Sequence, residues 1–141
     1  MNDFEKVNIY RGFKYAIHLN DLRGYRCGYV EIKEDHPLYE VKFNEIDIDC
    51  ISLSYNGRLK IISGYFIGWD HNHIWDGVDK EAIRQYHPDN AEDLIYEAIS
   101  LKDVCRGSRA TLEDVEKECF NVIDELYRKY ESKSNKKNKS K

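Results

Sequence analysis

Alternating apolar and polar positions dominate the first two thirds of the chain and predict β-strands. The segments 10–17 and 25–33 both alternate, and residues 20–24 between them (Asn-Asp-Leu-Arg-Gly) have turn chemistry. We expect these two segments to pair as an antiparallel hairpin. Pro37 should end the second strand, because proline cannot donate a hydrogen bond to a β-ladder.

A second pair of strands is expected further along. The segment 46–55 has the clearest alternation in the chain, and Asn56-Gly57 after it predicts a tight turn, since both residues tolerate a positive φ. The partner strand should cover 61–70. It contains two glycines, which inside a strand often mark a bulge or the close approach of another group.

The last third of the chain has helical periodicity. Residues 88–90 (Pro-Asp-Asn) can cap a helix over 91–102 with an apolar stripe. After a break at 106–109, a longer helix should begin near Thr111 and carry apolar residues at helical spacing to about residue 130. The sequence therefore predicts an α+β fold, with an N-terminal antiparallel β-sheet followed by C-terminal α-helices packed on one side.

Charge and length divide the chain into a domain and a tail. The 141 residues suit one domain, and their formal net charge is −4. Residues 132–141 carry five lysines and no acid, which leaves −9 for residues 1–131. We predict a single ligand-binding domain at 1–131 and a disordered lysine-rich tail at 132–141. A body this acidic disfavours binding to a nucleic-acid polymer, because affinity for the phosphate backbone comes mainly from Lys and Arg.

Hydropathy and cysteine spacing predict a soluble, cytoplasmic protein with no membrane partner. No stretch approaches the ~20 apolar residues of a membrane span, and no secretion signal is visible. Cys27, Cys50, Cys105 and Cys119 lie far apart without a C-x-x-C pair, which argues against a zinc ribbon. We expect reduced and mostly buried thiols.

The densest candidate site is the segment 66–76, at the end of a predicted strand. The rings of Trp69 and Trp75 could stack on a base, while Asn72 and Asp70 could bind its edge or a ribose hydroxyl. The structural alternative, in which Trp69 belongs to the core, remains equally open.

Two histidines in the same segment offer a metal-site alternative. His71 and His73 could bind a metal with Asp70 or Asp76, as a metal-dependent phosphodiesterase or nucleotide hydrolase would require. Three adjacent residues (His-Asn-His) do not reproduce the nuclease motif of that name, which spans a wider strand–strand–helix unit. No G-x-S-x-G nucleophile motif is present either, so binding without turnover is favoured.

Basic residues beside glycines form the third candidate group. Arg106 and Arg109 lie just before the predicted helix start at Thr111, where unpaired N–H groups favour an anion such as phosphate. Arg26 in the glycine-rich segment 22–30 and Arg58 after the predicted turn could add positive charge, although single arginines on an acidic body are as often simply solvated. Neither the P-loop nor the dinucleotide fingerprint is present, and no cofactor is predicted.

Several of these segments together resemble a family of small phage proteins. The resemblance rests on residues 10–12 (Tyr-Arg-Gly), 24–30 (Gly-Tyr-Arg-Cys-Gly-Tyr-Val), 36–39 (His-Pro-Leu-Tyr), 66–73 (Phe-Ile-Gly-Trp-Asp-His-Asn-His) and a closing amphipathic helix. The chain is similar to the first type of Thoeris anti-defence protein, a phage sponge. The resemblance covers about residues 10–130.

The resemblance implies a function and an assembly. Members of that family bind cyclic ADP-ribose isomers made by bacterial TIR-domain enzymes and withhold them uncleaved, in the cytoplasm of the infected host cell. They form homo-oligomers built from dimers, with sites between subunits. On chemical grounds, the ligand-binding residues we expect are Arg26, Arg58, Trp69, Asn72, Trp75, Arg106, Arg109 and Thr111. The alternatives are the hydrolase that uses His71 and His73, and an acidic inhibitor of a host enzyme.

Overall fold

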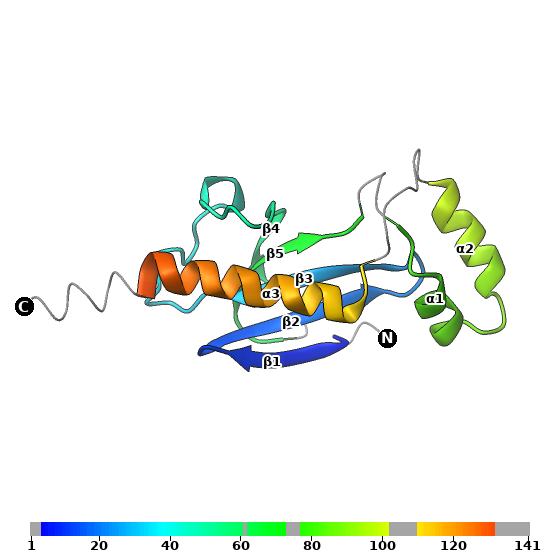
Figure 1. Cartoon of the computed structure of the whole chain (residues 1–141), viewed down its shortest axis with the longest axis horizontal. Coiled ribbons are helices and arrows are strands. Elements are labelled where there is room, and N and C mark those ends of the chain that lie inside the picture. Colours follow the sequence, from blue (N-terminus) through cyan, green and yellow to red (C-terminus); the bar gives the residue numbers. More distant parts are fainter. Residues whose placement is uncertain (1–3, 61, 73–76, 102–109, 132–141) are drawn as a thin grey trace, which may run out of the picture.

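The computed structural model describes residues 4–60, 62–72, 77–101 and 110–131. Its centre is a five-stranded antiparallel sheet with the strand order β1-β2-β3-β5-β4. Helix α3 lies across one face of this sheet, and helices α1 and α2 lie at one end (Figure 1). The α+β fold predicted from the sequence is confirmed.

The elements follow one another along the chain with the sheet first and the helices last. They are β1 (Lys6–Tyr10), β2 (Phe13–Asn20), β3 (Tyr25–Glu31), a 3₁₀ turn (Phe43–Glu45), β4 (Tyr55–Arg58), β5 (Tyr65–Asp70), α1 (Lys80–Tyr86), α2 (Ala91–Ser100), α3 (Leu112–Leu126) and a π-helical turn (Tyr127–Glu131).

The predicted hairpin between the first two alternating segments is confirmed as β2 and β3, which pair from Tyr15↔Val30 to Asn20↔Tyr25. The strand β1 was not predicted. It joins β2 through Arg11 and Gly12, whose φ angles of 51° and 83° form a tight two-residue turn.

The core lies between the sheet and α3. Alternate residues of β2, β3 and β5 point at the helix, and its buried stripe meets them. The fully buried members from these two layers include Ile17, Val30, Ile67, Val115, Cys119, Val122, Ile123 and Leu126. Their burial explains the helical spacing of the apolar residues after Thr111, since each turn of α3 must cover the sheet.

The prediction of a strand over 46–55 is wrong. The apolar residues there do turn inward, but residues 46–54 form no strand. The backbone N–H groups of Asp49 and Cys50 donate instead to the buried carboxylate of Glu125 on α3, at 2.7 and 3.0 Å. Burial alone would raise the pKa of Glu125, but these bonds and one from Lys129 lower it to about 2. A side chain distant in sequence thus takes the place of a neighbouring strand.

The prediction of a tight turn at Asn56-Gly57 is also wrong. Both residues lie within β4, and the predicted partner strand begins only at Tyr65. The side-chain carbonyl of Asn56 accepts the N–H of Phe43 at 2.9 Å, and its amide donates to the hydroxyl of Tyr65 at 2.8 Å. These contacts hold the residue in an extended strand.

The two predicted helices are confirmed as α2 and α3, and α1 was not predicted. Helices α1 and α2 pack on each other around a small second core that contains Val78, Ile83, Ala91, Ile95 and Ala98. The side chain of Asp79 caps α1 by accepting the N–H of Ala82.

The cysteine prediction holds in part. Cys27, Cys50 and Cys119 are free thiols, and Cys119 is buried, but Cys50 is exposed. Cys105 and the tail 132–141 lie outside the described residues. Among the helices that the structure describes, none has the length and apolar character required to cross a membrane.

Candidate functional site

A polar cleft lies where the segment before β1 and the starts of α1 and α3 approach the start of β3. It has a volume of about 500 Å³. Its lining combines one arginine, four carboxylates and a few neutral side chains: Glu5, Arg26, Asp79, Glu81, Ala82, Gln85, Tyr86, Thr111, Leu112 and Glu113. The volume is within the range of small-molecule sites, about 300–1,000 Å³.

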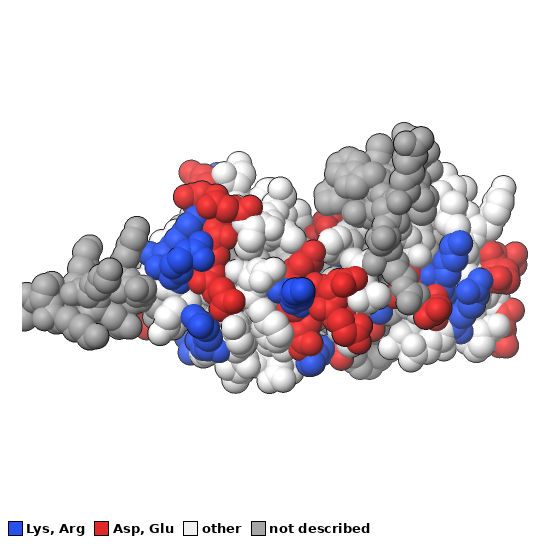
Figure 2. All heavy atoms as spheres, viewed as in Figure 1, with Lys and Arg blue, Asp and Glu red and all other residues white. Residues whose placement is uncertain are grey.

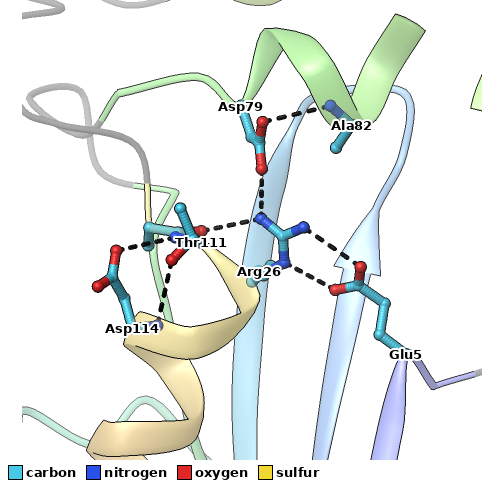
Figure 3. A network of polar contacts seen from close by, with 7 residues as sticks. Glu5, Arg26, Asp79, Ala82, Thr111 and Asp114 are labelled. Atoms are coloured by element: carbon cyan, nitrogen blue, oxygen red, sulfur yellow. Dashed lines mark hydrogen bonds and ion pairs between the residues drawn. The ribbon is translucent and has the colours of Figure 1, made fainter. Parts of the chain in front are cut away.

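Arg26 forms the floor of the cleft and joins three separate segments (Figure 3). Its Nε and Nη2 donate to the two carboxylate oxygens of Glu5 at 2.7 and 3.2 Å. Its Nη1 donates to Asp79 Oδ2 at 2.6 Å and to the carbonyl oxygen of Ala110 at 2.9 Å. These bonds connect the segment before β1, the start of α1 and the start of α3. The charge at the centre of the network is buried, since Arg26 is only 5% exposed.

The protonation of Arg26 follows from these contacts. Burial alone would lower its pKa, but the hydrogen bonds from its guanidinium to Glu5 and Asp79 raise the pKa above the ordinary value. The guanidinium is therefore permanently charged, and four of its five N–H donors are already used within the protein.

Local sequence explains how Asp79 reaches Arg26. The N–H of Asp79 donates to the carbonyl of Gly24 at 2.8 Å, and Gly24 has a φ of 70°. A Cβ on Gly24 would lie 2.9 Å from the Val78 side chain and 3.0 Å from the Asp79 backbone. Glycine at this position therefore allows the β2–β3 turn to contact the start of α1.

The start of α3 forms another wall of the cleft. Thr111 caps the helix by accepting the N–H of Asp114, and the N–H of Thr111 donates to the Asp114 carboxylate at 3.1 Å. Hydrogen bonds from the backbone N–H and the side chain of Thr111 to the Asp114 carboxylate lower the pKa of Asp114. The positive end of the helix thus already holds a carboxylate of its own.

The cleft is acidic overall. Arg26 is the only cationic side chain of the described lining, against Glu5, Asp79, Glu81 and Glu113. Figure 2 shows acidic side chains gathered over the N-terminal half of α3. Such a lining favours hydroxyl and amino groups of a ligand, which can donate to carboxylates, and disfavours an unaccompanied phosphate.

Five of the eight predicted ligand-binding residues lie in the described ranges, and two of these five, Arg26 and Thr111, come together in this cleft. Trp69 lies elsewhere: it is 2% exposed, its indole N–H donates to Glu118 at 3.0 Å, and it packs so closely over Gly28 that a Cβ there would lie 2.5 Å from the ring. The stacking role predicted for Trp69 is therefore wrong, because its ring belongs to the core.

Neither Asn72 nor Arg58 lines the cleft. Asn72 is exposed beyond the end of β5, and its N–H donates to Asp70 Oδ1 at 3.0 Å. Arg58 is exposed on β4, and its guanidinium donates to the hydroxyl of Tyr39 at 2.7 Å. Trp75, Arg106 and Arg109 lie outside the described residues.

The possible metal site is described only in part. Nε2 of His71 lies 2.8 and 3.0 Å from the two carboxylate oxygens of Glu118 on α3. Within the described ranges, no group of three or more His, Cys, Asp or Glu side chains could hold a metal ion. His73 and Asp76 lie outside those ranges.

Sequence reasoning missed most of the cleft. Glu5, Asp79, Glu81, Gln85, Tyr86 and Glu113 were not among the predicted site residues. Asp79 did leave a signal, since an aspartate before the amphipathic segment 80–86 is a typical helix N-cap. The others are ordinary polar residues whose convergence depends on the tertiary fold.

Comparison of the chain with protein-family models, with curated proteins and with solved structures found no match.

Proposed function

We propose that this protein binds a nucleotide-derived small molecule in the acidic cleft and sequesters it without cleaving it. The specific ligand proposed is a cyclic ADP-ribose isomer, so the protein would be a phage anti-defence sponge that withholds an immune signal from the host effector. The observation that carries the proposal is the cleft of about 500 Å³ above the buried, immobilised Arg26. A rigid floor reduces the entropy lost when a ligand is ordered.

The lining has groups suited to the sugar and base of such a ligand. Carboxylates of Glu81 and Glu113 can accept hydrogen bonds from ribose hydroxyls or from an exocyclic amine. Tyr86, which is 47% exposed at the cleft, offers the aromatic face that was expected from tryptophan.

The pyrophosphate requires positive charge that the described lining does not supply. Arg26 is already paired with two carboxylates. Arg106 and Arg109 precede Ala110 and Thr111 in the chain, and under this proposal they supply the phosphate contacts. The resemblance also implies sites between subunits, which would bring in cations from a second copy.

The test is isothermal titration calorimetry with a purified cyclic ADP-ribose isomer. Stacking on an aromatic ring contributes about 1–3 kcal/mol per base, so Tyr86→Ala should raise the Kd by about 5- to 150-fold. Tyr96→Ala is the matched control, since Tyr96 is 78% exposed on α2 and does not line the cleft. It should bind as the parent does.

A second pair of variants tests the phosphate contacts. Arg109→Glu should abolish detectable binding, whereas Arg84→Glu should not change it, because Arg84 does not line the cleft and forms an exposed ion pair with Glu92. No binding heat with the parent protein would refute the proposed ligand. In that case, elemental analysis for a stoichiometric transition metal would test the hydrolase alternative, and a stable complex with a host protein would support the inhibitor alternative.

A further inference from the structure

The edge strand β1 exposes an apolar surface. Val7 is 47% exposed and Ile9 is 65% exposed, and both lie at the outer margin of the sheet. In Figure 1, β1 runs along the lower margin with no other labelled element outside it. Proteins usually protect such an edge with charged side chains, proline, a bulge or a covering loop, because an open edge pairs readily with another strand.

The register shows which backbone groups point outward. The two-residue turn makes Tyr10 and Phe13 a hydrogen-bonded pair, so the alternation of an antiparallel ladder turns the N–H and C=O groups of Val7 and Ile9 away from β2. The N–H of Ile9 agrees with this: it donates to the side-chain oxygen of Asn8 at 2.8 Å. A small amide therefore occupies one outward donor.

The charges next to this edge are neutralised within the chain. Lys6 pairs with Glu116 at 2.5 Å, and Arg11 pairs with Asp124 at 3.3 Å. The middle of β1 carries no ionisable side chain. On a body with a formal charge of −9, this strand is a surface where two copies can meet without opposing carboxylates.

The opposite edge of the sheet is less suitable. Strand β4 has four residues, contains a glycine and ends at the exposed Arg58. The side chain of its Asn56 is already bound to Phe43 and Tyr65. Strand β1, by contrast, contains no glycine and exposes two apolar side chains, Val7 and Ile9, in its middle.

We propose that two copies of this chain pair through β1, antiparallel, about a two-fold axis at Asn8. Val7 of each copy then lies opposite the partner's Ile9, and the outward N–H and C=O groups of these residues exchange hydrogen bonds. Val7 and Ile9 pair with Ala16 and Lys14, which alternate with the α3-facing Tyr15, so the apolar contacts form on the sheet face opposite α3. The Asn8 amide releases the N–H of Ile9 to the partner strand.

This pairing affects the cleft as well, although it does not depend on any ligand. Glu5 directly precedes β1 and holds the guanidinium of Arg26. A paired β1 therefore fixes one wall of the cleft. Five paired residues on each copy bury less surface area than a standard protein–protein interface, which buries about 1,600 Å². We therefore expect a dissociation constant in the micromolar range.

Sedimentation equilibrium of the full chain at about 1–200 μM tests the proposal, because this range brackets micromolar self-association. The parent protein should show a monomer–dimer equilibrium. Val7→Lys and Ile9→Glu should each weaken dimerisation by at least about tenfold, and thermal unfolding should confirm that each remains folded, since both side chains are largely exposed. The control Tyr96→Lys introduces the same charge as Val7→Lys at a more exposed position on α2, and it should dimerise as the parent does.

The double variant Val7→Lys/Ile9→Glu tests the register. Each introduced ammonium group would lie opposite an introduced carboxylate of the partner, so dimerisation should recover. A parent protein that stays monomeric at 200 μM, or single variants that dimerise like the parent, would overturn the proposal. Single variants that weaken the dimer without recovery in the double variant would refute the register about Asn8.

Discussion

Replacing Arg26 with methionine should destabilise the fold by about 3–5 kcal/mol, the typical loss when one partner of a buried ion pair is removed. The substitution removes four hydrogen bonds and leaves two carboxylates facing each other across the floor of the cleft. The side chain of Asp79 is 7% exposed and that of Glu5 is 15% exposed, so solvent compensates only in part. A domain of this size has a stability of about 5–15 kcal/mol, so the loss is large but need not prevent folding.

The measurement is urea unfolding at pH 7 of the parent, Arg26→Met, Glu5→Gln and the double variant. Glu5→Gln alone should cost less, because it leaves the Asp79 contact intact. If Arg26 and Glu5 act through each other, the double variant will be more stable than the sum of the two single losses predicts. Arg26→Lys is a control for charge without the guanidinium geometry, and it should recover only part of the stability.

A loss below about 1 kcal/mol for Arg26→Met would refute this reasoning. It would mean that Arg26 behaves as a solvated surface ion pair and does not tie β1, α1 and α3 together. The account of the cleft as a pre-organised site would then fail with it.

Three further predictions concern the core and the α3 network. Gly28→Ala should destabilise the fold by about 1–3 kcal/mol in urea unfolding, because the added Cβ would lie 2.5 Å from the Trp69 ring; a neutral effect would contradict the close packing. Glu125→Gln should lower the free energy of unfolding at pH 7 by on the order of 2 kcal/mol. Because the folded-state pKa of about 2 lies below the unfolded value of about 4.3, the difference in stability between parent and variant should disappear as the pH falls from about 4.3 to 2. A difference independent of pH would refute the role of the carboxylate. Cys50 is exposed as a residue, but desolvation of its thiol group and the hydrogen bond to Glu125 raise the pKa of the thiol to about 12, so its alkylation at pH 8 should be slow. Glu125→Gln should accelerate the alkylation, and equal rates measured by peptide mass spectrometry would contradict the contact.

Local patterns sufficed for the parts of the fold that depend on neighbouring residues. The β2–β3 hairpin has alternation on both sides of a turn, and α3 has an apolar stripe beginning at the N-cap Thr111. Both signals lie within a window of about 20 residues.

Local patterns failed where the partner of a segment is distant in sequence. The segment 46–55 alternates like a strand, but the carboxylate that binds its backbone N–H groups is Glu125, 75 and 76 residues away. The tight-turn signal of Asn56 failed for a different reason: its side chain binds Phe43 and Tyr65, 13 and 9 residues away, and these contacts are not encoded in the Asn-Gly dipeptide.

The candidate site was predictable only in its chemistry. Arg26 attracted attention as a basic residue among glycines, but its partners Glu5 and Asp79 lie 21 and 53 residues away. The sequence could therefore indicate that a cation is present, whereas only the fold shows that Arg26 is buried and hydrogen-bonded to three separate segments. The ligand-stacking role predicted for Trp69 was wrong because no local pattern distinguishes a core tryptophan from one that stacks on a ligand.

The most direct test of the central proposal is to recover the ligand after binding. The purified protein is mixed with the product of a TIR-domain cyclase, free ligand is removed, the protein is heat-denatured, and the supernatant is analysed by mass spectrometry. Intact cyclic ADP-ribose isomer in near-stoichiometric amount is the predicted result. An opened or cleaved product would make the protein an enzyme, and the absence of any nucleotide would contradict sequestration.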